Sequence, residues 1–194
     1  MKRAWLMPAL GALAVLLVAC GRAGVGPTPT AAPTAGEQAS PALSDEQFLA
    51  AMIEHHQGAI EMAKIALERA EHPEVRQLSE DIIATQQAEI EQMRSWQREW
   101  FGAEATPGGH AGHGMSAEEM GMDVDLDELR RAEPFDRAFL EAMIRHHEGA
   151  VRMAEQIRSS TERRELRELA DDIIATQRAE IEQMRAWLAG WYGQ

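Results

Sequence analysis

Apolar residues recur every three or four positions along four stretches of this 194-residue chain, which is the spacing of amphipathic α-helices. The first helix is expected from about Asp45 to about Ala70, because Ser44 and Gln47 have the spacing of a capping box. Pro73 suits the first turn of a second helix, and Pro134 opens a third. The pattern therefore predicts an all-α protein.

The third and fourth helices repeat the first and second. A shift of 91 positions, which relates His55 to His146, makes 29 of the 49 positions from 48 to 96 identical in the second copy. Ser159 with Glu162 is then expected to cap the fourth helix. Identity at this level indicates the duplication of one helical hairpin.

Two hairpins that each bury one face make a four-helix bundle with approximate twofold symmetry. We expect this bundle over residues 44–192, with repeat one at 44–100 and repeat two at 134–192. Residues 101–133 interrupt the helical pattern, and a linker of this length allows a long crossover between the hairpins.

The N-terminal segment is typical of export. Lys2 and Arg3 precede an apolar run that ends in small residues before Cys20, the single cysteine. Residues 1–19 therefore resemble a bacterial lipoprotein signal peptide, with cleavage before Cys20 and lipid on its thiol, although a plain signal peptide or an uncleaved anchor would look similar. Residues 20–43 predict a flexible tether. We expect an exported lipoprotein anchored at the periplasmic or cell-surface side of a membrane.

The apolar side of the predicted helices carries polar groups. In the first and third helices two adjacent histidines and two methionines point inward, and in the second and fourth a glutamine lies in the middle of the apolar stripe. The inward set is Met52, His55, His56, Met62, Gln86, Glu89 and Met93, repeated as Met143, His146, His147, Met153, Gln177, Glu180 and Met184. A buried imidazole without a partner costs on the order of 1–3 kcal/mol, so these groups need partners.

Two explanations account for the buried histidines. Gln86 and Glu89 could hydrogen-bond His55 and His56 across the hairpin while methionines fill gaps in the core. Alternatively, the side chains bind a metal. Imidazole and thioether without thiolate favour copper(I), and silver(I) by the same softness, whereas imidazole with Gln and Glu oxygens would suit copper(II), zinc or iron.

The metal hypothesis divides the inward set by role. His55 and Met62 lie on one edge of their helix and Met52 and His56 on the other, so one helix offers histidine–methionine pairs in two directions. The candidate ligands are Met52, His55, His56, Met62, Met143, His146, His147 and Met153. Gln86, Glu89, Met93, Gln177, Glu180 and Met184 are candidates for additional ligands or for orienting the imidazoles.

The linker contains further soft donors in Gly-rich sequence. His110, His113, Met115, Met120 and Met122 are typical of a metal-capture segment with mobile, exchangeable ligands, although such a composition can also arise by chance.

The motif Met-x-x-His-His-x-x-Ala-Ile/Val-x-Met-Ala, followed by Gln-x-x-Glu-Ile-x-x-Met, resembles domain-of-unknown-function family 305 over about residues 44–191. The resemblance implies a CopM-like, ferritin-like four-helix bundle that binds copper or silver outside the cytoplasm for metal tolerance or handling. It covers the candidate ligands in the helices, and the linker lies outside the shared motif.

Charge and motif content narrow the function further. The net charge of −13 is unlike the basic footprint of a nucleic-acid-binding protein. A ferritin-like di-metal oxidase remains an alternative, but such enzymes use Glu-x-x-His motifs, and this chain contains none. A structural bundle whose histidines only fill the core is a second alternative. We favour a non-enzymatic copper-binding protein whose partners are metal ions and a possible copper-handling protein. Its oligomeric state stays open.

Overall fold

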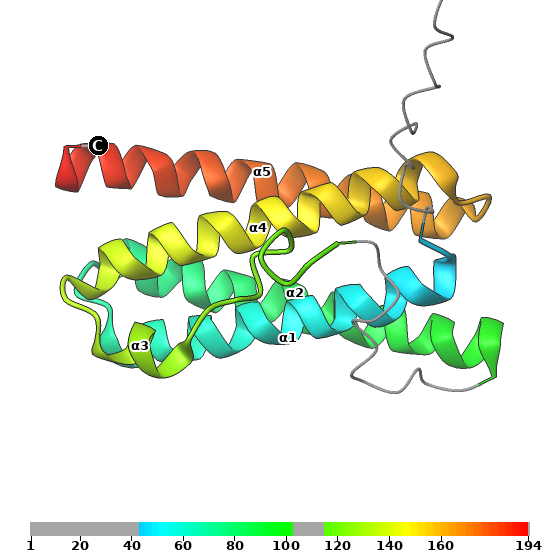
Figure 1. Cartoon of the computed structure of the whole chain (residues 1–194), viewed down its shortest axis with the longest axis horizontal. Coiled ribbons are helices and arrows are strands. Elements are labelled where there is room, and N and C mark those ends of the chain that lie inside the picture. The colour runs from blue at the N-terminus through cyan, green and yellow to red at the C-terminus, as the bar shows by residue number, and fades with distance from the viewer. Residues whose placement is uncertain (1–42, 103–114, 194) are drawn as a thin grey trace, which may run out of the picture. The chain divides into compact units, whose positions relative to one another are not determined.

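The computed structural model describes residues 43–102 and 115–193, and this part of the chain forms a bundle of α-helices without a β-strand (Figure 1). The helices are α1 (Asp45–Arg69), α2 (Pro73–Phe101), α3 (Leu126–Arg131), α4 (Phe135–Ser160) and α5 (Arg164–Tyr192). The predicted all-α class and the four long helices are confirmed.

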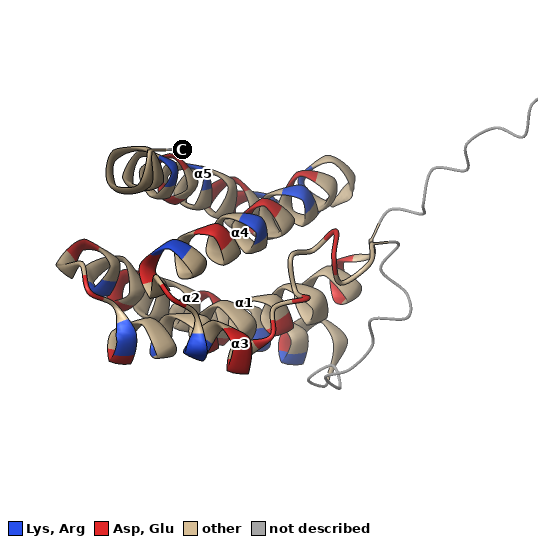
Figure 2. Ribbon diagram, turned by 60° about the vertical axis from the view of Figure 1, so that its left-hand side comes forward, with Lys and Arg blue, Asp and Glu red and all other residues tan. Residues whose placement is uncertain are grey.

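The long helices form two hairpins, as the repeat predicts. α1 packs on α2 and α4 packs on α5, while contacts between α1 and α4 join the hairpins. Figure 1 shows the hairpins one above the other, with α1 and α4 running in opposite directions. Since these contacts hold the two hairpins together, the bundle is centred on the crossing of α1 and α4. Acidic and basic residues recur along all four long helices (Figure 2).

The ends of the helices follow local chemistry, with one exception to the predictions. Ser44 Oγ accepts from Gln47 N, and Gln47 Oε1 accepts from Ser44 N, which confirms the capping box of α1. The predicted cap of the fourth helix is wrong. α4 continues through Ser160, so Ser159 still lies in its last turn and donates to Gln156 O, and α5 begins after Arg163 without a side-chain cap.

The linker contains structure that the sequence pattern did not indicate. α3 is a helix of 6 residues whose N-cap, Asp125, accepts from the backbone N–H groups of Asp127 and Glu128. Leu129 of α3 is buried against the core, so the second part of the linker packs on α1 and α4 instead of crossing free of them.

Other predictions fall on residues outside the described ranges: the signal peptide at 1–19, Cys20, all of the tether except its last residue, and the linker histidines His110 and His113. Within the described ranges, no helix has the length and apolar character needed to cross a bilayer.

Candidate metal centre

Four histidines, which we call the histidine row, gather at the crossing of α1 and α4. The rings of the inner pair, His55 and His146, are in contact, with their centroids 3.8 Å apart and their planes tilted by 43°. The ring centroids of the outer pair, His56 and His147, each lie 6.4 Å from that of the adjacent histidine in the sequence. All four side chains are buried, with exposed fractions of 0–1%. The predicted inward orientation of both His-His pairs is therefore present in the fold.

The two outer imidazoles bond to carboxylates of the adjacent helix in the same hairpin. His56 Nε2 donates to Glu89 Oε2 of α2 at 2.6 Å, and His147 Nε2 donates to Glu180 Oε2 of α5 at 2.7 Å. Because a carboxylate only accepts, a proton lies on Nε2 of each ring, and Nδ1 is the nitrogen that could bind an ion. Both Nδ1 atoms are buried without a hydrogen-bond partner.

The two inner imidazoles have different surroundings. His55 Nε2 donates to the backbone oxygen of Met120 at 2.9 Å, and its Nδ1 has no partner. His146 has a partner at neither ring nitrogen. Five buried imidazole nitrogens therefore lack a hydrogen bond, and leaving such a group unsatisfied costs on the order of 1–3 kcal/mol. Hydrogen bonding across each hairpin explains only part of this row.

Burial keeps the inner imidazoles neutral. Desolvation, with a smaller contribution from His56, lowers the pKa of His55 to about 3. Desolvation and the adjacent His55 hold the pKa of His146 well below its ordinary value. The neutral ring is the form that donates a lone pair to a metal, so these histidines are in the ligating form at neutral pH.

The buried methionines divide between the two core clusters of the bundle. Met52, Met93 and Met153 belong to one core cluster, and their repeat mates Met143, Met184 and Met62 belong to the other, and we call these two sets the methionine clusters. Every one of these side chains is 0–1% exposed. Each cluster takes one thioether from the other repeat, because the crossing of α1 and α4 brings the second half of each helix beside the first half of its partner.

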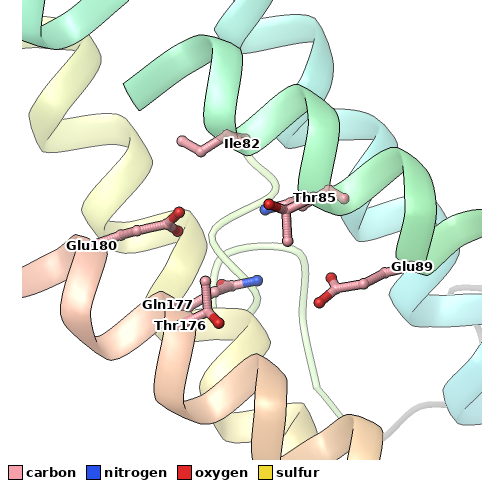
Figure 3. Close-up of a pocket in the computed structure, with 7 residues that line it drawn as sticks. Ile82, Thr85, Glu89, Thr176, Gln177 and Glu180 are labelled. Carbon is pink, nitrogen blue, oxygen red and sulfur yellow. The ribbon is translucent and has the colours of Figure 1, made fainter. Parts of the chain in front are cut away.

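A small pocket between α2 and α5 holds the predicted glutamines and glutamates (Figure 3). The pocket measures about 10 Å³, roughly the space of one water molecule. Figure 3 shows the carboxylates of Glu89 and Glu180 pointing toward each other from opposite sides. Gln86 and Gln177 are buried, and the Oε1 atom of each lacks a partner. Both glutamates are 14–15% exposed, whereas the imidazoles that donate to them are fully buried.

No set of three or more His, Cys, Asp and Glu side chains within the described residues is placed to hold an ion. Glu89 and Glu180 each accept a hydrogen bond from one imidazole.

The linker methionines differ from the expectation of mobile ligands. Met120 is 1% exposed and lies in the core cluster of Met52, and its carbonyl accepts from His55. Met115 and Met122 are half-buried against the same cluster. The sequence reasoning missed the backbone oxygen of Met120 as a partner of His55. Gly149 was the available signal, because a Cβ atom there would lie 1.9 Å from the backbone oxygen of Met120.

Residues 45–188 match the family described as Domain of unknown function (DUF305). The chain belongs to the DUF305 family. The predicted resemblance is thus confirmed over most of the chain, and the buried Met-x-x-His-His motifs described above lie inside the matched region.

Solved structures of DUF305 relatives share the fold. CopM in the Cu(II)-bound form is 45% identical with a TM-score of 0.70, covering 78% of this chain and 100% of that chain. CopM in the Cu(I)-bound form is 41% identical with a TM-score of 0.68, covering 77% and 99%. CopM is also known in an Ag-bound form. A DUF305 fragment from Deinococcus radiodurans is 34% identical with a TM-score of 0.66, covering 77% and 98%.

A curated relative matches a shorter stretch. An uncharacterized protein of Acanthamoeba polyphaga mimivirus is 45% identical over 53 residues, which are 27% of this chain and 35% of the viral protein. The match therefore spans about a third of that relative and concerns the sequence of one hairpin at most.

Proposed function

We propose that this DUF305 protein binds copper(I), and silver(I) by the same chemistry, at the crossing of α1 and α4, and that it sequesters or hands on the ion without catalysis. One observation carries the proposal: five buried imidazole nitrogens lack a hydrogen bond in a core that also buries the side chains of seven methionines. Neutral nitrogen and thioether sulfur are the donors that soft monovalent ions prefer. The copper- and silver-bound forms of CopM support the same choice of ion.

The residues fit the ion in type and in protonation state. His55, His56 and their repeat mates would supply nitrogen, and the two methionine clusters would supply sulfur. Glu89 and Glu180 hold the Nε2 protons of the outer rings, so the Nδ1 lone pairs face away from the carboxylates. The bound ion would supply the missing partners of the imidazole nitrogens, and the protein would supply orientation and exclusion of water.

The decisive experiment is competition for copper(I) at pH 7 between the full-length protein and chelators of graded strength. We expect wild-type protein to withdraw copper(I) from a weak chelator. A variant in which His55, His56, His146 and His147 are replaced by Leu should lose this ability. His72→Asn, which changes a histidine outside the row, is the matched control. Equal copper uptake by the quadruple variant, or none by wild type, contradicts the proposal.

We also propose that the protein acts outside the cytoplasm, anchored by lipid on Cys20. The positively charged start, the apolar run and the small residues before this cysteine support it. Cells grown with labelled fatty acid should yield labelled wild-type protein in the membrane fraction. Cys20→Ser should remove the label and release the protein. Label retained by Cys20→Ser would contradict lipidation at this residue.

A further inference from the structure

The two repeats are alike in sequence, but a segment of the linker covers only one of their equivalent faces. Gly58 and Gly149 occupy matching positions, each three residues after the first histidine of its pair. A Cβ atom on Gly149 would lie 1.9 Å from the backbone oxygen of Met120. A Cβ atom on Gly58 would meet only His146 Nε2, at 3.1 Å. Backbone therefore lies directly on α4 at Gly149, and no backbone lies on α1 at the equivalent place.

Residues 115–122, which we call the cover segment, are built for this contact. Gly121 has a φ angle of 67°, and a Cβ atom there would lie 2.4 Å from the backbone oxygen of Arg145 on α4. Within the segment, Ser116 N donates to Glu119 Oε2 and Glu119 N donates to Ser116 Oγ. Arg152 of α4 donates to the backbone oxygen of Glu119. Substitution of Gly121, or of Gly149 on α4, would displace the segment from α4.

The cover segment makes the surroundings of the two inner histidines unequal. It adds Met120 to the core cluster of Met52, Met93 and Met153, and the other core cluster contains no linker methionine. It also fixes the proton of His55 on Nε2 through the carbonyl of Met120, whereas nothing fixes the tautomer of His146. The cluster of Met52 thus contains four of the buried methionines and the other cluster three, and His55 is the one inner imidazole that a hydrogen bond orients.

We infer that the chain has two unequal soft-ion sites and that the cover segment makes the site beside Met52 and Met120 the tighter of the two. This inference rests on the proposed function. Partners that orient a metal-binding histidine typically change affinity by about 10- to 100-fold, so we expect the two binding steps to differ by about that factor. Burial of Met120 would also slow release of the ion from this site.

The first test uses the wild-type protein. In full-length protein labelled with [methyl-¹³C]methionine, one equivalent of copper(I) should shift the methyl signals of Met52, Met93, Met120 and Met153. A second equivalent should shift those of Met62, Met143 and Met184. Parallel shifts of both groups from the first addition would overturn the inference while leaving copper binding intact. No shift at any ratio would overturn the proposed function together with it.

Two variants carry the second test. Met120→Leu keeps the side-chain volume and removes the sulfur. In a titration with a competing chelator, the copper(I) dissociation constants of the two binding steps should then lie within a few-fold of each other. Gly149→Ala should displace the carbonyl of Met120 and give the same merging, whereas Gly190→Ala, where a Cβ atom meets nothing within 4 Å, should not. If both Met120→Leu and Gly149→Ala keep the wild-type difference between the two dissociation constants, the inference is overturned.

Discussion

A neutral imidazole has one proton and one lone pair, and its neighbours decide which nitrogen holds which. In this bundle Glu89, Glu180 and the carbonyl of Met120 all accept from Nε2, so three of four buried histidines keep an unshared pair on Nδ1. The carboxylates come from helices that do not carry the histidines. On these three rings the position of the proton therefore depends on a residue 33 positions away in sequence, or 65 in the case of Met120.

Replacing both carboxylates should weaken binding without removing a ligand. Glu89→Gln with Glu180→Gln keeps the shape of the side chains but weakens their hold on the Nε2 protons, so copper(I) affinity should fall by about 10- to 100-fold. Competition against a chelator measures the change. The exposed pair Glu91→Gln with Glu182→Gln is the matched control and should bind as wild type. Unchanged affinity in the buried pair would show that these bonds do not orient the rings.

The depressed pKa of His55 predicts how the stability of the metal-free protein varies with pH. The unfolded chain takes up a proton near the ordinary value of 6.5, whereas the folded chain does so only near 3. Acid therefore favours the unfolded state. The contribution of His55 to the free energy of unfolding is full above pH 6.5. It declines as pH falls from 6.5 toward 3, by up to about 1.4 kcal/mol per pH unit.

Urea unfolding between pH 7 and pH 4 measures this decline. His55→Leu should show a shallower dependence than wild type, because one buried titrating group is gone. The control is Gln57→Leu, which changes a half-buried residue of α1 that does not titrate and should keep the wild-type slope. Equal slopes in wild type and His55→Leu would contradict the assignment of this pH dependence to burial of His55.

At the scale of elements, the turns that join each hairpin meet the N-terminus of the other hairpin's first helix. Asp136, which is 2% exposed in α4, accepts from the backbone N–H groups of Glu71 and His72 and from His72 Nδ1. The ring of His72 stacks on Trp191 at 3.8 Å. In the other half, Arg163 pairs with Asp45 and lies over Trp100. The duplication thus preserved this contact between a turn and a helix, which we call the clamp, while arginine stands in one copy (Arg163) where histidine stands in the other (His72).

The two clamps should differ in energy. Asp136→Ala removes the buried acceptor of hydrogen bonds from Glu71 N, His72 N and His72 Nδ1 and should lower the free energy of unfolding by about 2–3 kcal/mol. Asp45→Ala, the equivalent change at a more exposed ion pair, should cost less than about 1 kcal/mol. Urea denaturation compares both with wild type. Equal losses would mean that burial of the carboxylate does not set the strength of the clamp.

Sequence periodicity predicted the elements better than their contacts. Met52, His55 and Gln86 lie on the buried side because helical spacing alone places them there. Which methionines share a cluster depends on how α1 and α4 cross, and the repeat does not encode that crossing locally. The cover segment lies in a Gly-rich stretch without periodicity, so the burial of Met120 follows from a nonlocal contact that no local pattern reports.

At the scale of the whole molecule, a bound ion should stabilise the bundle by mass action. A free ion at 100 times its dissociation constant adds about 2.7 kcal/mol, which corresponds to roughly 5–11 °C in melting temperature for a protein of this size. Thermal unfolding of the full chain with silver(I) tests this without a reductant. Magnesium, which prefers oxygen ligands, should leave the melting temperature unchanged. No shift with silver(I) would contradict binding to the folded state.

The exchange of one thioether between the repeats bears on the origin of the chain. Met153 completes the group around Met52, and Met62 completes the group around Met143, so a lone hairpin could assemble neither group. A half-length ancestor would have enclosed an ion only by pairing with a second copy of itself, and such a pair would have had two identical halves. Fusion into one polypeptide gave the halves separate sequences and placed between them a connecting stretch that only one of them could use.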